Sequence, residues 1–361
     1  MKRILFVTRC FPPSPGGMER FAKDVYDALS PKAELYTYTW SGSRLALFVV
    51  LPYFFVRSFW TLLTKKVDVI HAQDGVVSIM LLPLAKLFRR PMVVVIHGLD
   101  ITYRLWLFQV LIKWSLKNAD TIICISSAAK AEVVSRGVDE QKTTVIPIGV
   151  TDDLFDSDHK AARRSISEVV TNLGDHKLLL SSGRLIERKG LAWFVSNVMP
   201  LVVVSRPDTM LVISGEGPWR EPIEKAIHDT ELSDKVVLLG RTSDELLKNL
   251  YNAADCFVMP NIPVPGDMEG FGRVLIEAAL CEVPVVASGI EGITDAIHDG
   301  KNGTLVPAEN PKRHAQAILK VLGDTKARHT VGVKAREYSL QTFGWDAIIS
   351  QYLRIYDEIG R

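Results

Sequence analysis

The chain has 361 residues, of which 47% are hydrophobic and 23% are charged, a balance typical of a globular protein. That length exceeds one typical hydrophobic core, so we expect two domains. The net charge of only +2 gives no reason to expect a nucleic-acid partner. The first apolar stretch is too short for a signal peptide, and the four cysteines form no C-x-x-C pair. We therefore expect a cytoplasmic protein without disulfides or a zinc site.

Short apolar segments rich in β-branched residues alternate with helix-length segments along the whole chain. Nearly continuous apolar strands that alternate with helices are typical of parallel sheets covered on both faces. The sequence therefore predicts an α/β fold with two doubly wound domains, divided near the polar stretch at 150–175. The expected strands lie at 3–8, 33–38, 67–72, 92–97, 120–126 and 143–148, and then at 177–183, 209–215, 235–240, 255–260, 284–288 and 303–307.

One apolar segment, Leu45 to Leu63, is long enough to cross a bilayer. It lies between two strands of one predicted sheet, which a membrane crossing would separate, so we expect a buried or surface-lying helix. Residues 41–117 hold ten Lys or Arg and three acidic residues, a balance of +7, beside many aromatic residues. Such a surface suits an anionic membrane. Two interpretations stay open: peripheral membrane contact, and a buried helix beside a solvated basic face.

Two glycine-containing segments follow predicted strands and could approach an anion. Gly16 and Gly17 precede the first helix, whose free N–H groups could face a phosphate, although a plain tight turn would use the same glycines. The segment 181–190, "SSGRLIERKG", places Arg184, Arg188 and Lys189 at the end of a strand, where ligands bind in open α/β sheets. These side chains can bind phosphate, but a solvated basic loop is the alternative.

The segment "EGFGRVLIE" has a glutamate at each end, Glu269 and Glu277. If all of it were helical, the two residues would lie about 12 Å apart along the axis. The two carboxyl groups of a glycosidase lie roughly 5–9.5 Å apart, so we expect no hydrolase pair. The spacing favours two carboxylates that hold separate sets of hydroxyls, with an anion between them near Gly270 and Gly272. A surface cap and a solvated glutamate are the alternative.

His97 and Asp100 follow the fourth predicted strand, with a glycine between them. That position favours a ligand-facing histidine, although a lone histidine is more often structural. The dinucleotide-binding pattern G-x-G-x-x-G is missing after the first strand, which disfavours a dehydrogenase.

Together these segments resemble family 4 of the glycosyltransferases, also described as glycosyl transferases group 1. The matching features are Gly16-Gly17, His97, "GRL" and "RKG" within 183–190, "GEGP" at 215–218, "LGRTSDEL" at 239–246, and the E-x7-E motif at 269–277. The resemblance implies a retaining enzyme with the GT-B fold, two Rossmann-like domains facing across a cleft. Residues 1–155 would receive the acceptor and 156–344 would bind the nucleotide sugar. The last helix, about 345–361, would cross back to the first domain.

The resemblance also implies roles for individual residues. Glu269 would contact hexose hydroxyls, Glu277 the ribose, and Arg184 and Lys189 the leaving diphosphate, with Arg188 beside them. Backbone groups of Gly270, Phe271, Gly272 and Arg273 would face the hexose and phosphate. Arg241 and Thr242 would line the base pocket, and His97 with Gly16 and Gly17 would approach the sugar from the first domain. The catalytic set is thus His97, Arg184, Lys189 and Glu269.

We expect no metal cofactor, because no DxD cluster stands at a strand end. The expected donor is a GDP- or UDP-linked hexose, and the expected acceptor is a glycan or a lipid-linked sugar, as in polysaccharide or lipopolysaccharide synthesis. Two alternatives remain at this stage: a sugar-nucleotide epimerase of the same fold, and a nucleotide-sugar-binding protein without catalysis.

Overall fold

The computed structural model describes residues 1–14, 16–103 and 105–359, and within them twelve strands form two parallel sheets of six strands each. Every predicted strand is present. Most of them are apolar runs buried between helices, whereas the edge strand at 34–39 is only partly buried. The strands are β1 (Arg3–Thr8), β2 (Glu34–Thr39), β3 (Val69–Ala72), β4 (Met92–Ile96), β5 (Thr121–Cys124), β6 (Thr143–Val145), β7 (Lys177–Ser182), β8 (Thr209–Ser214), β9 (Val236–Gly240), β10 (Cys256–Met259), β11 (Val285–Ser288) and β12 (Thr304–Val306).

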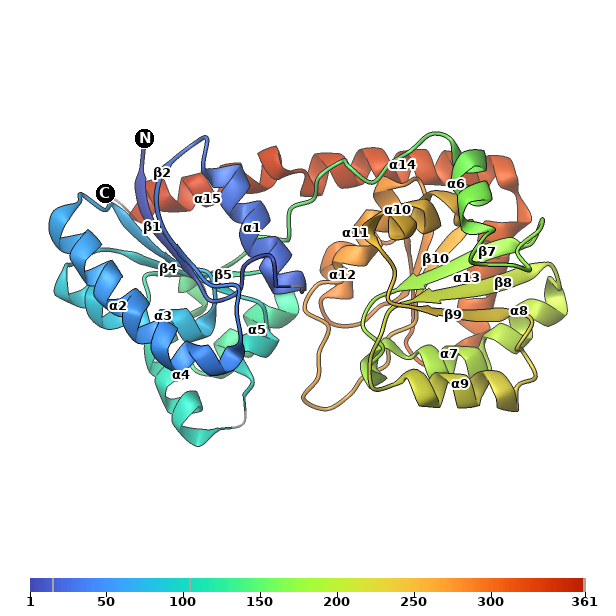
Figure 1. The fold of residues 1–361 in the computed structure, drawn as a ribbon, viewed down its shortest axis with the longest axis horizontal. Helices are drawn as coiled ribbons and strands as arrows, with labels where there is room; N and C mark the ends of the chain where they lie inside the picture. Colours follow the sequence, from blue (N-terminus) through green and yellow to red (C-terminus); the bar gives the residue numbers. More distant parts are fainter. Residues whose placement is uncertain (15, 104, 360–361) are drawn as a thin grey trace. The chain divides into compact units, whose positions relative to one another are not determined.

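The α-helices connect these strands and cover both faces of each sheet (Figure 1). They are α1 (Gly17–Leu29), α2 (Leu47–Thr64), α3 (Gly75–Leu87), α4 (Trp106–Asn118), α5 (Ser127–Ser135), α6 (His159–Ile166), α7 (Leu191–Asn197), α8 (Met199–Ser205), α9 (Arg220–Asp229), α10 (Asp244–Ala253), α11 (Arg273–Leu280), α12 (Ile293–Ala296), α13 (Pro311–Gly323), α14 (Thr325–Phe343) and α15 (Trp345–Ile359).

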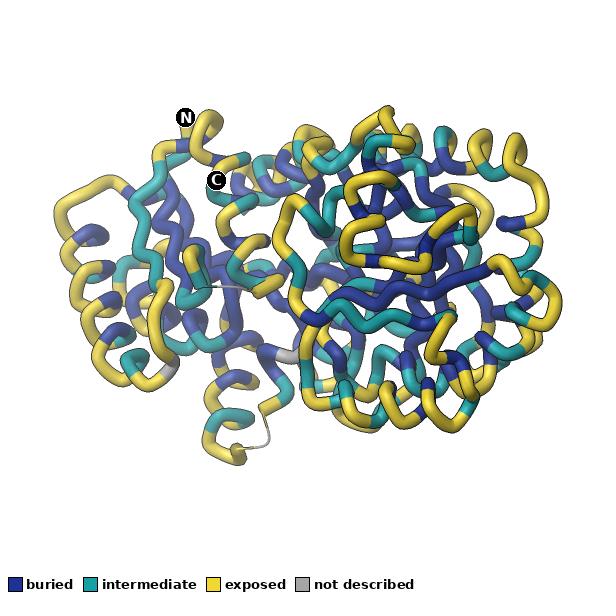
Figure 2. Tube along the Cα trace, turned by 45° about the vertical axis from the view of Figure 1, so that its right-hand side comes forward, coloured by how far each residue is buried: buried dark blue, intermediate teal, exposed yellow. Residues whose placement is uncertain are grey.

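The first sheet has the strand order β2-β1-β3-β4-β5-β6. Strand β2 lies on one side of β1, and β3 to β6 follow in order on the other side. The step from β1 to β2 and the later steps from β2 to β6 therefore run in opposite directions across the sheet. Right-handed connections then put α1 on one face and α2, α3 and α4 on the other. Helix α1 packs with α15, and α3 packs between α2 and α4. Figure 2 shows the inner strands buried and the outer turns of the helices exposed.

The second sheet has the order β12-β11-β10-β7-β8-β9, the strand order of a Rossmann fold. Its core joins the strands to α7, α8, α9 and α13, with Phe194, Leu211 and Ile318 fully buried. Helices α10, α11 and α12 lie on the other face (Figure 1). The order reverses between β7 and β10, which are neighbours, so the loops that follow these two strands start side by side.

The chain divides into two compact units, Met1–Gly149 with Phe343–Arg361, and Val150–Thr342. Helix α15 therefore belongs to the first unit, where the Tyr356 hydroxyl lies 2.8 Å from His71 Nδ1. The sequence predicted a boundary after residue 155. The structure places it a few residues earlier, after Gly149. The reason is that Asn252 fastens the following segment to the second unit: its side chain donates to the Leu154 carbonyl at 2.7 Å and accepts from the Asp156 amide at 2.8 Å.

The apolar segment Leu45–Leu63 forms most of helix α2, which lies on the surface of the first unit. Phe54 and Leu62 are buried, whereas Phe48, Val49 and Trp60 are 84%, 74% and 55% exposed. Among the described residues, α2 is the one helix long and apolar enough to cross a membrane by length and composition, and only 17% of it is buried. The basic residue Arg104 and the end of the predicted last helix at 360–361 lie outside the described residues.

Candidate functional site

Three loops meet at the carboxyl edge of the second sheet, packed backbone against backbone. A Cβ atom on Gly215 would lie 1.8 Å from the Gly183 carbonyl oxygen, and one on Gly217 would lie 2.1 Å from the Leu185 carbonyl oxygen. Gly190 adopts φ +64°, and a Cβ there would lie 2.1 Å from the Pro260 carbonyl oxygen. Close loop packing therefore requires glycine at Gly190, Gly215 and Gly217, and it fixes the loop after β7 against those after β8 and β10.

A buried cluster of charges lies at the point where the strand order reverses. Glu269 Oε2 accepts a hydrogen bond from Lys189 Nζ at 2.6 Å, another from Arg188, and a third from Asn261 Nδ2 at 3.1 Å. Arg188 also donates to Asp267 at 3.0 Å. The side chains of Glu269 and Lys189 are 10% and 13% exposed. The topology therefore brings together residues that are 80 positions apart in the sequence.

The charged groups in this cluster shift one another's pKa values. Burial by itself would raise the pKa of Glu269, but Lys189 and Arg188 outweigh it, and the pKa is lowered. Burial lowers the pKa of Lys189, and Glu269 offsets only part of that effect. Glu269 is thus held as a carboxylate, and a further anion beside Lys189 would stabilise its ammonium.

Arg184 differs from its neighbours because its side chain is exposed. Within the described part of the chain, no carboxylate forms an ion pair with it. It is a free cation on the loop that carries Arg188 and Lys189, and it can therefore bind an incoming anion without breaking an existing pair.

Glu269 precedes helix α11 and does not cap it, which corrects the prediction that one helix joins Glu269 to Glu277. Helix α11 begins at Arg273, and Gly272 before it adopts φ +85°, a left-handed conformation that favours glycine. The distance estimated from helical rise therefore does not apply to this pair. Gly270 packs so closely against Gly292 that a Cβ on Gly292 would lie 2.2 Å from the Gly270 carbonyl oxygen, and Phe271 is buried.

Glu277 lies inside α11 with 7% of its surface exposed. It accepts hydrogen bonds from Arg273 Nε at 3.1 Å and from the Tyr251 hydroxyl at 3.0 Å. Arg241 and Thr242 follow β9 at the same edge of the sheet, and Thr242 Oγ1 lies 2.8 Å from Ser214 Oγ. These residues extend the candidate site from the charge cluster towards the ends of β8 and β9.

The site also contains side chains that were not predicted from the sequence: Tyr251 beside Glu277, and Asn261, Asp267 and Glu291 around the charge cluster. Asn261 lies two residues after the end of β10, and its Oδ1 atom is buried without a partner among the described residues. Glu291 follows β11 and accepts a hydrogen bond from the Glu269 amide. Polar residues just after two neighbouring strands were the available signal for Asn261 and Glu291, because ligands bind at this edge.

In the first unit, His97 lies at the end of β4 and is fixed by its surroundings. Its Nε2 atom lies 3.0 Å from the Gln73 backbone carbonyl, which can only accept, so Nε2 donates to it and, in the neutral ring, Nδ1 carries the lone pair. Its amide donates to Asp100 at 3.0 Å, and Asp100 also accepts from the Gly75 amide at 3.1 Å. His97 is therefore one defined tautomer that can accept a hydrogen bond.

Helix α1 begins at Gly17, directly after Gly16. A Cβ on Gly16 would lie 2.1 Å from the Glu19 carboxylate, whereas one on Gly17 would meet no atom within 4 Å. The protein's own packing therefore does not require glycine at 17, which leaves space above the helix start. Within the described residues, no three His, Cys, Asp or Glu side chains gather as a metal site would require.

Comparison with known proteins identifies the family. The model of Glycosyltransferase Family 4 matches residues 15–154, and that of Glycosyl transferases group 1 matches residues 163–338. An uncharacterised glycosyltransferase of Methanocaldococcus jannaschii is 30% identical over 304 residues, which cover 81% of this chain and 75% of the relative. The chain belongs to the family 4 glycosyltransferases. The predicted family and the predicted enzyme class are thereby confirmed.

Other glycosyltransferases are similar over nearly the whole chain. A GDP-mannose-dependent alpha-(1-6)-phosphatidylinositol monomannoside mannosyltransferase of Mycolicibacterium smegmatis is 27% identical and covers 95% of both chains. The crystal structure of Anabaena HepE in complex with UDP has a TM-score of 0.80 at 18% identity and covers 99% of this chain and 100% of that one. Sucrose-phosphate synthase of Thermosynechococcus elongatus has a TM-score of 0.78. These structures confirm the GT-B fold of this glycosyltransferase.

Proposed function

We propose that this glycosyltransferase moves a hexose from a GDP- or UDP-linked donor to a hydroxyl group of a glycan or lipid-linked acceptor, with retention of configuration and without a metal ion. The observation that carries the proposal is the buried cluster of Lys189, Arg188 and Glu269 beside the free cation Arg184. The mannosyltransferase relative is named as GDP-mannose-dependent, which supports mannose as the first sugar to test.

Charge on the leaving group explains the cations. Breaking the anomeric C–O bond leaves a nucleoside diphosphate with additional negative charge. Arg184, Lys189 and the first amides of α11 can stabilise that charge, each preorganised donor contributing about 3 kcal/mol. This arrangement supplies positive charge from the chain itself, which supports transfer without a metal.

The state of Glu269 supports a role in holding hydroxyl groups. Its Oε2 atom already accepts hydrogen bonds from two cations and one amide. A carboxylate neutralised in this way is a weak nucleophile, so we expect no covalent sugar intermediate on it. The acceptor hydroxyl then attacks from the face that the diphosphate leaves, which preserves the configuration, and gives its proton to the departing diphosphate oxygen. His97, with its lone pair on Nδ1, would accept a hydrogen bond from a sugar hydroxyl.

The outer surface of the first unit supports an acceptor at the cytoplasmic face of a membrane. Helix α4 exposes Trp106 and Trp114, at 76% and 44%, and α2 exposes a second apolar stripe. Lys113 and Lys117 are exposed on α4, and neither α2 nor α4 contains an acidic residue. The exposed charge on these helices is therefore basic, and each such residue near an anionic surface contributes about 1 kcal/mol to binding.

The donor is tested first. A thermal-shift screen against GDP-mannose, GDP-glucose, UDP-glucose and ADP-glucose should raise the melting temperature with a GDP- or UDP-sugar, because the donor binds only the folded state. Incubation with the selected donor should release nucleoside diphosphate when a membrane extract is added as acceptor. Release without any acceptor dependence would contradict transfer. Sedimentation with anionic vesicles at low and high salt tests the membrane contact, and we expect binding that weakens with salt.

A further inference from the structure

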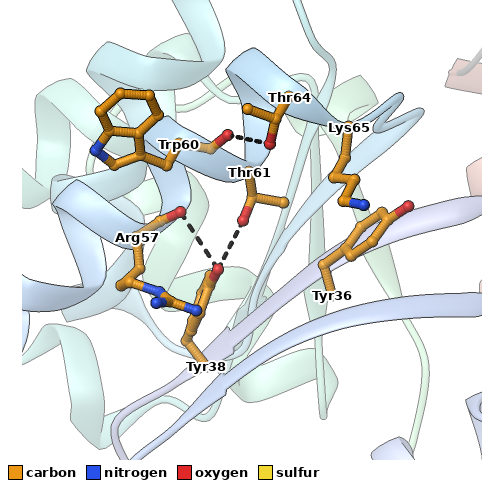
Figure 3. Close-up of a pocket in the computed structure, with 7 residues that line it drawn as sticks. All are labelled: Tyr36, Tyr38, Arg57, Trp60, Thr61, Thr64 and Lys65. Carbon is orange, nitrogen blue, oxygen red and sulfur yellow. Dashed lines mark hydrogen bonds between the residues drawn. The ribbon is translucent and has the colours of Figure 1, made fainter.

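A surface hollow of about 390 Å³ lies where helix α2 overhangs strand β2 in the first unit (Figure 3). Strand β2 is the last strand of its sheet and pairs only with β1, so no further strand covers its outer side. Tyr36 and Tyr38, two positions apart, point to the same face of β2. Arg57, Trp60 and Thr64 lie three and four positions apart on one side of α2. These five side chains form opposite walls of the hollow.

The charged groups of the hollow are two cations, Arg57 and Lys65, both exposed. Within the described residues neither of them forms an ion pair with a carboxylate. The Arg57 guanidinium lies 5.7 Å from the centre of the Tyr38 ring, and the Tyr38 hydroxyl is held by Thr61 Oγ1 at 2.6 Å. The Tyr36 hydroxyl donates to Glu34, which lies outside the lining of the hollow. The hollow therefore combines free positive charge with fixed aromatic walls.

The hollow opens beside an apolar stripe. On the outer side of α2, Tyr53, Val56 and Leu63 are 55%, 51% and 56% exposed. Trp60 belongs to both features, because it lines the hollow and is itself 55% exposed. A ligand that satisfies both features carries an anionic group and an adjoining apolar chain, which is the structure of a membrane lipid.

We propose that this hollow binds the phosphate ester of an anionic lipid headgroup, while the outer side of α2 contacts the acyl boundary. The Arg57 guanidinium can bind two phosphate oxygens in a bidentate manner, and Lys65 supplies a second charge. Two cations suit a phosphomonoester, which carries a charge of about −1.5 to −2 at neutral pH. The inference rests on the proposed membrane contact and adds a defined headgroup site to it.

The experiment compares two vesicles of equal surface charge. Phosphatidylcholine vesicles contain 20 mol % phosphatidic acid, or enough phosphatidylglycerol to give the same zeta potential. A diffuse basic surface binds both equally, whereas a phosphomonoester site prefers phosphatidic acid. We expect about 10-fold tighter binding to the phosphatidic acid vesicles, the effect of about one charge-assisted contact. The double variant Arg57→Gln, Lys65→Gln should bind both vesicles equally.

The matched control is Lys113→Gln, Lys117→Gln, which removes the same charge from α4 of the same unit. It should weaken binding to both vesicles and keep the preference. Equal binding of the wild type to both vesicles, or a preference that survives in the Arg57 and Lys65 variant, would overturn the headgroup site while leaving the membrane contact intact. If the wild type binds neither kind of vesicle, both the headgroup site and the membrane contact are overturned. Micromolar affinity for soluble glycerol 1-phosphate would assign the hollow to a free phosphate ester, against this proposal. Sugar transfer to a soluble acceptor should be unchanged in both variants.

Discussion

The two units build different chemistry on the same kind of six-stranded parallel sheet. At the strand ends of the second unit, the buried polar groups are charged and paired, as in Lys189 with Glu269. At those of the first unit, a buried ion pair joins Arg9 to Asp74 at 3.1 Å, and a separate, largely uncharged chain of contacts joins Tyr356, His71, Gln73 and His97. In both units the sheet determines only where the loops meet. The residues in those loops determine the chemistry of that edge: a charge cluster that can bind an anion in the second unit, and a histidine held in one position in the first.

The largest expected effect concerns the charged edge. Lys189→Ala and Arg184→Ala should each lower kcat by about 100- to 1,000-fold, because each removes a preorganised donor to the leaving diphosphate. Lys225→Ala is the matched control, since this lysine lies on α9 of the same unit and its side chain is 74% exposed. Steady-state rates of nucleoside diphosphate release provide the measurement. Near-normal turnover in both variants would remove the assignment of the diphosphate to this cluster.

The second prediction concerns the buried histidine His71 of the first unit. Burial lowers the pKa of His71 to about 4, although the hydrogen bond to Gln73 opposes that shift. His71 therefore becomes protonated near pH 6.5 in the unfolded chain, but only near pH 4 in the folded first unit. The stability that neutral His71 contributes is present above pH 6.5 and is lost as the pH falls towards 4, by at most about 3 kcal/mol.

Hydrogen exchange of β3 and α15 at pH 7 and pH 5, in the wild type and in His71→Asn, checks this prediction. The wild type should lose protection at pH 5 more strongly than the variant does. Burial raises the pKa of Asp100, which acts with the opposite sign, but that effect is present in both proteins and cancels in the difference. Equal pH dependence of the two proteins would show that His71 is not held neutral by the fold.

A smaller effect is expected at Glu277. If this carboxylate holds the ribose, Glu277→Gln should raise the KM for the donor about 10-fold with kcat nearly unchanged, the effect of one charge-assisted hydrogen bond. A donor that lacks the 2′- and 3′-hydroxyls separates this role from the contacts of Glu277 with Arg273 and Tyr251. The wild type should bind that donor about 10-fold more weakly, and the variant should show no further loss. Full additivity of the two changes would assign Glu277 to structure alone.

No effect is expected from metal removal. Dialysis against EDTA should leave turnover unchanged, since the proposed charge stabilisation comes from Arg184, Lys189 and the start of α11. The control adds Mg²⁺ or Mn²⁺ to the treated enzyme. Loss of activity that either ion restores would mean that the cations of the second unit are not sufficient for the leaving group.

The sequence predicted the strands well and the site only in part, for physical reasons. Most of the strands are buried, nearly continuous apolar runs, and β2, which is only partly buried, is rich in β-branched and aromatic residues, so all of them could be recognised locally. The contact of Lys189 with Glu269 depends on β7 and β10 becoming neighbours, which no local pattern reports. Gly272 looked like part of a helix start, but its left-handed backbone ends the loop and leaves Glu269 outside α11. The contact of Asp267 with Arg188 and that of Glu291 with the Glu269 amide likewise form only when the loops meet.

The stereochemistry of the product tests the central claim most directly. The enzyme is incubated with GDP-mannose or UDP-glucose, whichever raises the melting temperature, and with a lipid-linked or glycan acceptor. The anomeric configuration of the product is then measured by NMR from the one-bond C1–H1 coupling. We predict a new glycosidic bond with the α configuration of the donor, formed together with one nucleoside diphosphate. A β-linked product, or nucleotide release with free sugar whether or not an acceptor is present, would contradict this account.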